Sequence, residues 1–151
     1  MPHPALLLVA ALAAPGSLQA SREPSRLELA KLYVTTGTGA RVAPEVEALA
    51  GRRVRVVGFM AKMEEYVPRG ALYLTRMPVE TEEGGGGTGD LPPGALRVEV
   101  PHLAEKEIEW IPGAVEVIGT LQVGRAEDEE GRVSWLRVVV EDPPSAAAGA
   151  R

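Results

Sequence analysis

Cysteine is absent from this chain of 151 residues, and histidine and aromatic residues are scarce. The lack of cysteine excludes disulfides, thiolate metal ligands, thiol nucleophiles and a lipid anchor attached through a cysteine. The two histidines, His3 and His102, offer little material for an imidazole metal site or for acid–base catalysis. Aromatic residues make up only 4% of the chain, so any core has to be built from aliphatic side chains.

The charge balance is mildly acidic, with 21 Asp and Glu against 16 Lys and Arg and a formal net charge of −5. An acidic chain lacks the positive field that draws proteins to nucleic acids, which disfavours nucleic acid as a partner. The length fits one domain, and we expect a monomer.

The first twenty residues have the pattern of a signal peptide. Residues 5–14 are uninterrupted apolar residues, Pro15-Gly16 breaks the run, and the small residue Ala20 precedes the first charge. Such a run is too short to cross a membrane but is typical of a cleaved leader. We therefore predict a signal peptide over 1–20 and a periplasmic or secreted product without a membrane anchor. Because the leader begins without Lys or Arg, a disordered start is the alternative.

The remaining chain divides into an N-terminal extension (21–42), a domain (43–142) and a disordered tail (143–151). The extension contains a weak helical turn followed by extended residues. A short helix is predicted over 44–49, because Pro44 suits the first helical position, Glu45 and Glu47 suit the first turn, and Gly51 suits the position after the end.

Beyond Gly51 the periodicity changes to the alternation of β-strands, with strong enrichment in valine. Gly58 interrupts the first strand and predicts a bulge or bend there. A helix is predicted between the third and fourth strands, over 102–111, and Trp110 and Trp135 are interpreted as packing residues. Five strands are predicted, over 53–63, 71–77, 95–101, 114–124 and 132–141.

This order of elements predicts an all-β fold with minor α content: a five-stranded, OB-fold-like Greek-key barrel with a short helix between strands three and four. A small β-sandwich is the alternative, but it would not explain a single helix at that position. The glycine-rich loop 80–94 joins the second and third strands and reads as a flexible connection.

Several segments also resemble a bacterial exported family of unknown function. The stretch 43–60 (APEVEALAGRRVRVVGFM) resembles its helix and G-K/R-R-V-R-x-x-G-F-M signature, and residues 117–123 (VIGTLQV) resemble its G-T-L-x-V segment. The resemblance covers about 44–141. It implies an OB-like periplasmic protein without a catalytic activity, encoded near ABC-transporter components. Relatives carry a cysteine-containing, proline-rich loop between the second and third strands, of which only Pro92 and Pro93 remain here.

The sequence carries no recognisable catalytic or metal-binding motif. His102 has no histidine or cysteine nearby, no G-x-S-x-G occurs, and the glycine run 84–89 lacks the lysine of a phosphate-binding loop. The acidic turn 127–130 lacks the oxygen spacing of a calcium loop and reads as solvated charge. We therefore predict no metal, no cofactor and no enzymatic activity.

The candidate binding residues are Arg55, Tyr73, Arg76 and Arg97, which we expect on the outer face of the first three strands. OB-folds bind oligonucleotides and sugars on that face. The first hypothesis is a binding or accessory module of the cell envelope with a protein partner, which the resemblance suggests is an ABC-type transport complex. The second is oligosaccharide or single-stranded nucleic-acid binding. The third is an enzyme whose acid and base the sequence does not show.

Overall fold

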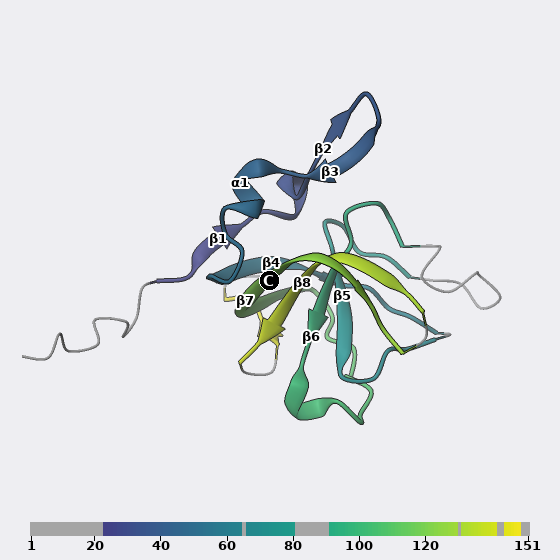
Figure 1. Ribbon diagram of the computed structural model, residues 1–151. Coiled ribbons are helices and arrows are strands. Elements are labelled where there is room, and N and C mark those ends of the chain that lie inside the picture. Colours follow the sequence, from purple (N-terminus) through teal and green to yellow (C-terminus); the bar gives the residue numbers. More distant parts are fainter. Residues whose placement is uncertain (1–22, 65, 81–90, 130, 142–143, 149–151) are drawn as a thin grey trace, which may run out of the picture.

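The structure is a computed structural model that describes residues 23–64, 66–80, 91–129, 131–141 and 144–148. The predicted leader and most of the glycine-rich loop lie outside these residues. The described chain is mostly β-structure, with one large mixed sheet, a two-stranded sheet and one short α-helix (Figure 1).

All five predicted strands are present in the large sheet. The sheet has seven strands in the order β1-β4-β5-β6-β8-β7-β9, and β4 also pairs with β7. Its strands are β1 (Ser25–Leu27), β4 (Arg53–Met60), β5 (Ala71–Thr75), β6 (Leu96–Glu99), β7 (Ala114–Glu127), β8 (Val133–Val140) and β9 (Ser145–Ala146).

Each of the five long strands pairs with two of the others. The β4–β5, β5–β6, β7–β8 and β4–β7 pairs are antiparallel, and the β6–β8 pair is parallel. Strand β4 pairs with two strands of the five, because residues 53–59 pair with β7 whereas Phe59 and Met60 pair with β5. These pairings leave little unpaired edge along the central strands, and unpaired edges invite aggregation.

The core is aliphatic, as the composition requires. Alternating residues of β4, such as Val54 and Val56, are fully buried, and the same alternation buries Val98 in β6 and Val117 in β7. Strand β5 differs from the prediction, because all five of its residues are buried. Both faces of β5 are therefore covered by other parts of the protein.

The segment predicted as an N-terminal extension (21–42) is packed against the domain and contains regular structure. Strand β1 pairs in parallel with β4, and a 3₁₀ turn (η1, Leu29–Lys31) follows it. Leu27, Leu29 and Leu32 are buried in the common core. These residues therefore belong to the core of the domain, although the sequence analysis placed the start of the domain at residue 43.

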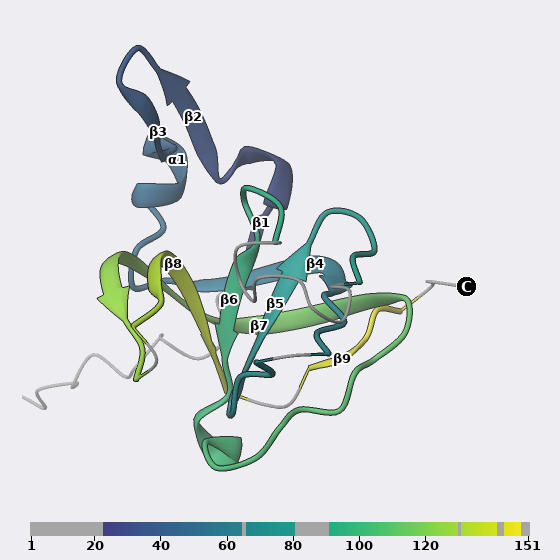
Figure 2. The same ribbon diagram turned by 90° about the vertical axis from the view of Figure 1, so that its right-hand side faces the viewer.

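A hairpin then projects away from the large sheet in both ribbon views (Figures 1 and 2). It consists of β2 (Tyr33–Thr36) and β3 (Gly39–Val42), joined by a turn at residues 37–38. The helix α1 (Pro44–Glu47) follows, with Pro44 in the first turn and two glutamates there, as predicted from the sequence.

The helix predicted over 102–111 is wrong. Only a 3₁₀ turn (η3, Pro101–Leu103) forms, and the rest is irregular. Isolated helices of this length are marginal in water, so tertiary contacts decide their conformation. Here the backbone of Glu107 forms an isolated antiparallel β-bridge with Arg69, and the Ile108 side chain is buried in the core. The Trp110 indole donates a hydrogen bond of 3.0 Å to the Met60 carbonyl. The backbone makes these contacts in an irregular conformation, which replaces the predicted helix.

Gly58 is not a bulge. It has no positive φ, and the β4–β7 register continues through it without a shift. A Cβ at this position would lie 2.5 Å from Leu29 Cδ1 and 3.0 Å from the Thr75 carbonyl oxygen. Glycine is therefore required by close approach rather than by backbone conformation. The register shift of this sheet lies instead in β7, between Val123 and Ala126.

Two further differences concern the end of the chain and the tryptophans. The tail predicted to be disordered over 143–151 contains β9, which pairs with Val115 and Glu116 of β7.

Trp110 and Trp135 are 41% and 54% exposed, so Trp135 in particular is not a core residue. A tryptophan on a strand surface is compatible with the sequence pattern, because alternation alone cannot assign its face to the core.

Candidate groove on the outer face of strands β5 and β6

A groove of about 580 Å³ lies against β6, between the β4–β5 connection, the turn after β6 and the β7–β8 hairpin. We call it the β6 groove. It is lined by Val67, Pro68, Arg69, Gly70, Arg97, Glu99, Pro101, Ala104, Glu105, Glu127, Asp128, Glu129 and Arg132. Three separate connections thus meet over one strand, which positions side chains from distant parts of the sequence together.

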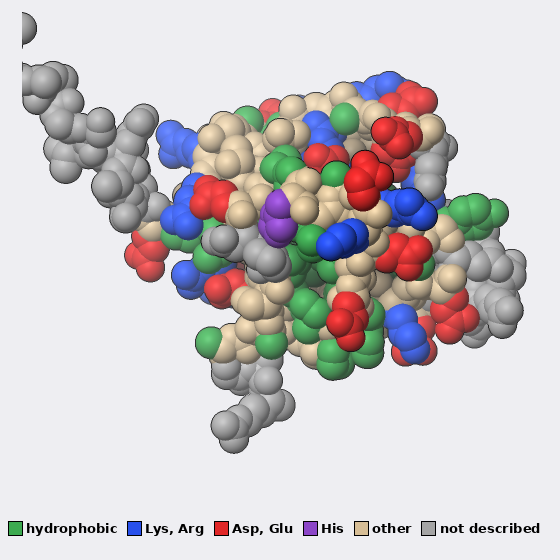
Figure 3. All heavy atoms as spheres, turned by 90° about the horizontal axis from the view of Figure 1, so that it is seen from below, with side chains coloured by type: hydrophobic (Ala, Val, Ile, Leu, Met, Phe, Trp, Pro, Cys, Tyr) green, Lys and Arg blue, Asp and Glu red, His purple; other side chains and the backbone are tan. Residues whose placement is uncertain are grey.

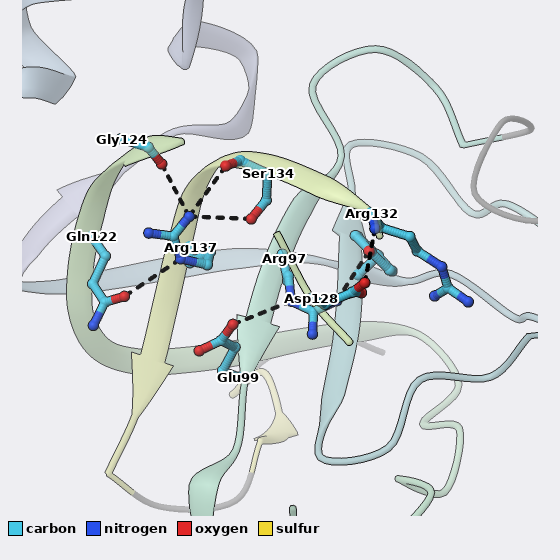
Figure 4. Close-up of polar contacts among 9 residues, drawn as sticks. Arg97, Glu99, Gln122, Gly124, Asp128, Arg132, Ser134 and Arg137 are labelled. Carbon is cyan, nitrogen blue, oxygen red and sulfur yellow. Dashed lines mark hydrogen bonds and ion pairs between the residues drawn. The ribbon is translucent and has the colours of Figure 1, made fainter. Parts of the chain in front are cut away.

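Arg97 forms the floor of this groove. Its side chain is only 12% exposed and makes ion pairs with Glu99 at 3.3 Å and with Asp128 at 3.2 Å (Figure 4). Its Nη1 also donates to the Tyr73 hydroxyl at 3.2 Å. Burial disfavours the charged guanidinium, but the hydrogen bonds to Tyr73 and Glu99 outweigh it and raise the pKa of Arg97. Arg97 is therefore a fixed cation whose charge is neutralised within the protein.

The strand register explains why Tyr73 and Arg97 meet. Tyr73 of β5 pairs with Arg97 of β6, which pairs with Arg137 of β8, which pairs with Gln122 of β7. Paired residues project from the same face of a sheet, so the register forms a continuous polar row across four strands. Tyr73 is 8% exposed, so it contributes its hydroxyl to this row and offers no aromatic surface for stacking.

Asp128 ties the β7–β8 hairpin to the floor of the groove. Its side chain accepts a hydrogen bond of 2.8 Å from the Arg132 backbone amide, and its own amide donates to the Arg132 carbonyl at 3.0 Å. Gly131, with φ +79°, closes the turn by donating to the Asp128 carbonyl. The carboxylate that shapes this turn also pairs with Arg97, so the hairpin has one position relative to β6.

The other end of the polar row stabilises the register shift in β7. Arg137 is only 9% exposed, and its Nη1 donates to the carbonyl oxygens of Gly124 and Ser134 and to the Ser134 hydroxyl (Figure 4). A bulge leaves backbone groups outside the regular ladder. Arg137 supplies donors to the groups at this bulge, so its role is structural.

Gly70 fixes the opposite wall. It has φ +61°, and a Cβ there would lie 2.5 Å from Ala104 Cα. Its amide donates to the Lys106 carbonyl at 2.8 Å, and its carbonyl accepts from the Val100 amide at 2.7 Å. A positive φ and a close backbone contact both require glycine here. The turn after β6 is thereby held against the β4–β5 connection.

The four residues singled out in the sequence do not form one site. Tyr73 and Arg97 lie together in the polar row, but Tyr73 is buried rather than exposed. Arg55 and Arg76 line a different hollow, beside β1. The sequence reasoning missed Asp128, which it treated as solvated charge. Asp128 and Gly131 do signal a turn, but no sequence pattern connects Asp128 with Arg97, 31 positions away.

Acidic side chains outnumber basic ones around the groove, with five carboxylates against three arginines. Glu99 and Asp128 are engaged by Arg97, and Glu127 pairs with Arg125 at 3.0 Å. Glu105 and Glu129 make no ion pair within the described part of the chain, and both are exposed. Arg69 is also exposed and makes no ion pair there, so the open rim carries two carboxylates and one guanidinium.

Other kinds of site find no support in the residues that the structure describes. Within them, no group of three or more His, Asp or Glu side chains could hold a metal ion. The same residues include no helix long and apolar enough to cross a membrane. The face seen from below carries basic and acidic side chains intermixed, without a broad patch of one sign (Figure 3).

Comparisons with known proteins give a structural likeness but no family. No protein-family model and no curated protein matches this chain. Among solved structures, a DUF3299 family protein from Pseudomonas aeruginosa PAO1 is similar, with a TM-score of 0.48 and 13% sequence identity over 84% of this chain and 99% of that chain.

Proposed function

We propose that this protein is an exported, non-enzymatic binding module of the cell envelope, and that the β6 groove is its docking site for a segment of a protein partner. The proposal includes the fold: the five long strands close an OB-like barrel. The ring of pairings through β4, β5, β6, β8 and β7 supports this topology, which is that of an OB-fold.

The position of the groove supports a binding role. OB-folds bind ligands on the face of their second and third strands, between the loops that follow the first and fourth strands. In this chain those strands are β5 and β6, and the loops are 61–70 and 128–132. The β6 groove lies between these loops.

The charge of the groove supports a basic polypeptide segment as the ligand, and this is the observation that carries the proposal. Arg97 is neutralised by its own carboxylates. Among the lining side chains without an ion pair in the described chain, Glu105 of the turn after β6 and Glu129 of the β7–β8 hairpin exceed Arg69 by one charge. An extended segment with a lysine or arginine could pair with both walls. A polyanionic single strand would meet repulsion at the same carboxylates and find no exposed aromatic ring at Tyr73.

The lining chemistry also favours binding over catalysis. The lining residues include no serine, threonine or histidine, so the groove as described offers no nucleophile paired with a base. Its floor residues Arg97, Glu99 and Asp128 are engaged with each other. The resemblance of the sequence to an exported family suggests an ABC-type transport complex of the envelope as the source of the partner.

The proposal can be tested by fluorescence anisotropy with labelled extended peptides that alternate valine with lysine, or valine with glutamate. We expect the lysine peptide to bind and the glutamate peptide not to bind. The double variant Glu105→Gln/Glu129→Gln should weaken binding of the lysine peptide about fivefold, as expected for two exposed charge pairs. The control Glu45→Gln/Glu47→Gln removes the same charge from α1 and should have no effect.

The same assay distinguishes the alternative function. Binding of an oligothymidylate strand or of neutral oligosaccharides, together with no binding of the lysine peptide, would replace the protein-docking proposal with the glycan or nucleic-acid hypothesis. If the two double variants weaken the lysine peptide equally, the interaction is nonspecific and the groove is not the docking site.

A further inference from the structure

Arg55 and Arg76, which the sequence suggested as binding residues, lie in a second hollow of about 580 Å³. We call it the β1 hollow. It is formed by β1, the turn η1, the outer face of β4 and the residue after β5. It is lined by Glu23, Pro24, Arg26, Leu27, Glu28, Leu29, Ala30, Arg55, Val57, Arg76 and Glu116. Its residues are separate from those of the β6 groove.

The strand register places two arginines directly beside each other in this hollow. Arg26 of β1 pairs with Arg55 of β4 in a parallel ladder, so both side chains leave the same face of the sheet. Neighbouring strands are about 4.8 Å apart. Like charges directly opposite each other destabilise a sheet. The two guanidinium groups therefore repel each other, and an anion placed between them would stabilise the pairing.

Three carboxylates, Glu23, Glu28 and Glu116, also line the hollow, and they engage its three arginines unevenly. The Nε atom of Arg55 lies 3.7 Å from Glu116 Oε2, which is longer than a hydrogen bond. Glu28 is engaged by Lys31 at 3.0 Å, and that hydrogen bond lowers the pKa of Glu28. The charge of Arg26 lowers this pKa further, so Glu28 offsets part of the charge of Arg26. Neither Arg26 nor Arg76 has a carboxylate within ion-pair distance in the described chain.

We propose that the β1 hollow binds a phosphate group, with Arg26 and Arg55 on one side and Arg76 on another. Guanidinium forks match phosphate oxygens in paired hydrogen bonds, and a dianion converts the repulsion between two arginines into attraction. Val57, which is 47% exposed, adds an apolar surface beside the arginines that suits a phosphate ester with a carbon moiety. Two sources share this chemistry: a soluble phosphate ester and the headgroup of an anionic phospholipid.

The test uses the mature chain with pyrophosphate as the soluble probe, measured by calorimetry and by the shift in melting temperature. We expect pyrophosphate to bind and to raise the melting temperature at low salt. Arg55→Gln and Arg76→Gln should each weaken binding about tenfold, the effect of losing one charge-assisted pair. The control Arg41→Gln removes an exposed arginine of β3 and should change binding less than about twofold.

Arg26→Gln separates binding from a structural role. Because it removes one of two like charges, it should leave the melting temperature without ligand unchanged or raised, while weakening pyrophosphate binding about tenfold. A lower melting temperature without ligand, combined with unchanged pyrophosphate binding, would show that Arg26 only supports the strand and would overturn the proposal.

Sedimentation with vesicles distinguishes the two sources. Binding to phosphatidylglycerol vesicles but not to phosphatidylcholine vesicles, with competition by pyrophosphate, identifies a lipid headgroup. Binding of pyrophosphate without vesicle binding identifies a soluble phosphate ester. If neither probe binds, or if Arg41→Gln weakens binding as much as Arg55→Gln, the β1 hollow is not a phosphate site. None of these outcomes depends on the peptide assay for the β6 groove.

Discussion

Gly119→Ala is the substitution that tests most directly how closely β7 lies against β8. Gly119 is buried and lies opposite Val54 of β4 on one side and Val140 of β8 on the other. A Cβ added there would collide with the Val139 carbonyl oxygen and lie 2.7 Å from the Val139 carbonyl carbon and 2.8 Å from Val140 Cα. All three atoms belong to the backbone, so no side chain can rotate away.

The expected cost follows from this geometry. Overpacking by one methyl group costs about 1 to 3 kcal/mol, and moving β8 away would weaken a ladder hydrogen bond worth about 1 kcal/mol. We therefore expect Gly119→Ala to lower the free energy of unfolding by about 3 kcal/mol. This corresponds to a loss of about a hundredfold in the folding equilibrium and about 12 °C in melting temperature.

The measurement is urea denaturation of the full chain, followed by circular dichroism. Gly37→Ala is the matched control, because its backbone has an ordinary φ and a Cβ there meets nothing within 4 Å. Its free energy of unfolding should change by less than about 0.5 kcal/mol. If Gly119→Ala and Gly37→Ala unfold at the same urea concentration, β7 does not approach β8 this closely and the proposed barrel is wrong.

Three further predictions concern packing, a buried cation and pH. Gly58→Val should cost about 1 to 3 kcal/mol by overpacking, and Leu29→Ala in the same chain should recover part of that cost in a double-mutant cycle. Arg137→Met should lower the free energy of unfolding by about 2 kcal/mol, because the Gly124 carbonyl loses the hydrogen bond donated by Arg137 Nη1. An unchanged urea midpoint would contradict this prediction. Burial raises the pKa of Tyr33, so its contribution to stability is complete below about pH 10 and is lost as the pH rises through the folded pKa. Tyr33→Phe should therefore lose less stability than the wild type between pH 9 and pH 11, and equal losses would show that this phenol does not titrate differently on folding.

The predictions that succeeded rest on local patterns. Alternation in β4 and β6 identified the strands, and Pro44 with its glutamates identified the start of α1. Each signal lies within a few residues of the structure that it predicts. The helix predicted over 102–111 failed because its signal was weak and Ile108 and Trp110 have partners elsewhere in the fold.

The candidate sites show the same division between local and distant information. Arg97 could be selected as an outward-facing cation on a strand, but its pairing with Asp128 joins positions 31 apart and depends on the β7–β8 hairpin folding back over β6. Likewise, Arg55 could be recognised, whereas its neighbour Arg26 belongs to a strand that pairs with β4 only in the folded chain.

The sequence by itself determined an aliphatic β-rich domain, the positions of its strands and the absence of thiol chemistry, because composition and periodicity act over short distances along the chain. Only the tertiary structure decided which charged side chains meet. Strand register sets the neighbours of each side chain, and it separated Tyr73 and Arg97 from Arg55 and Arg76. Register depends on how all strands of the sheet pair, which no single segment of the sequence specifies.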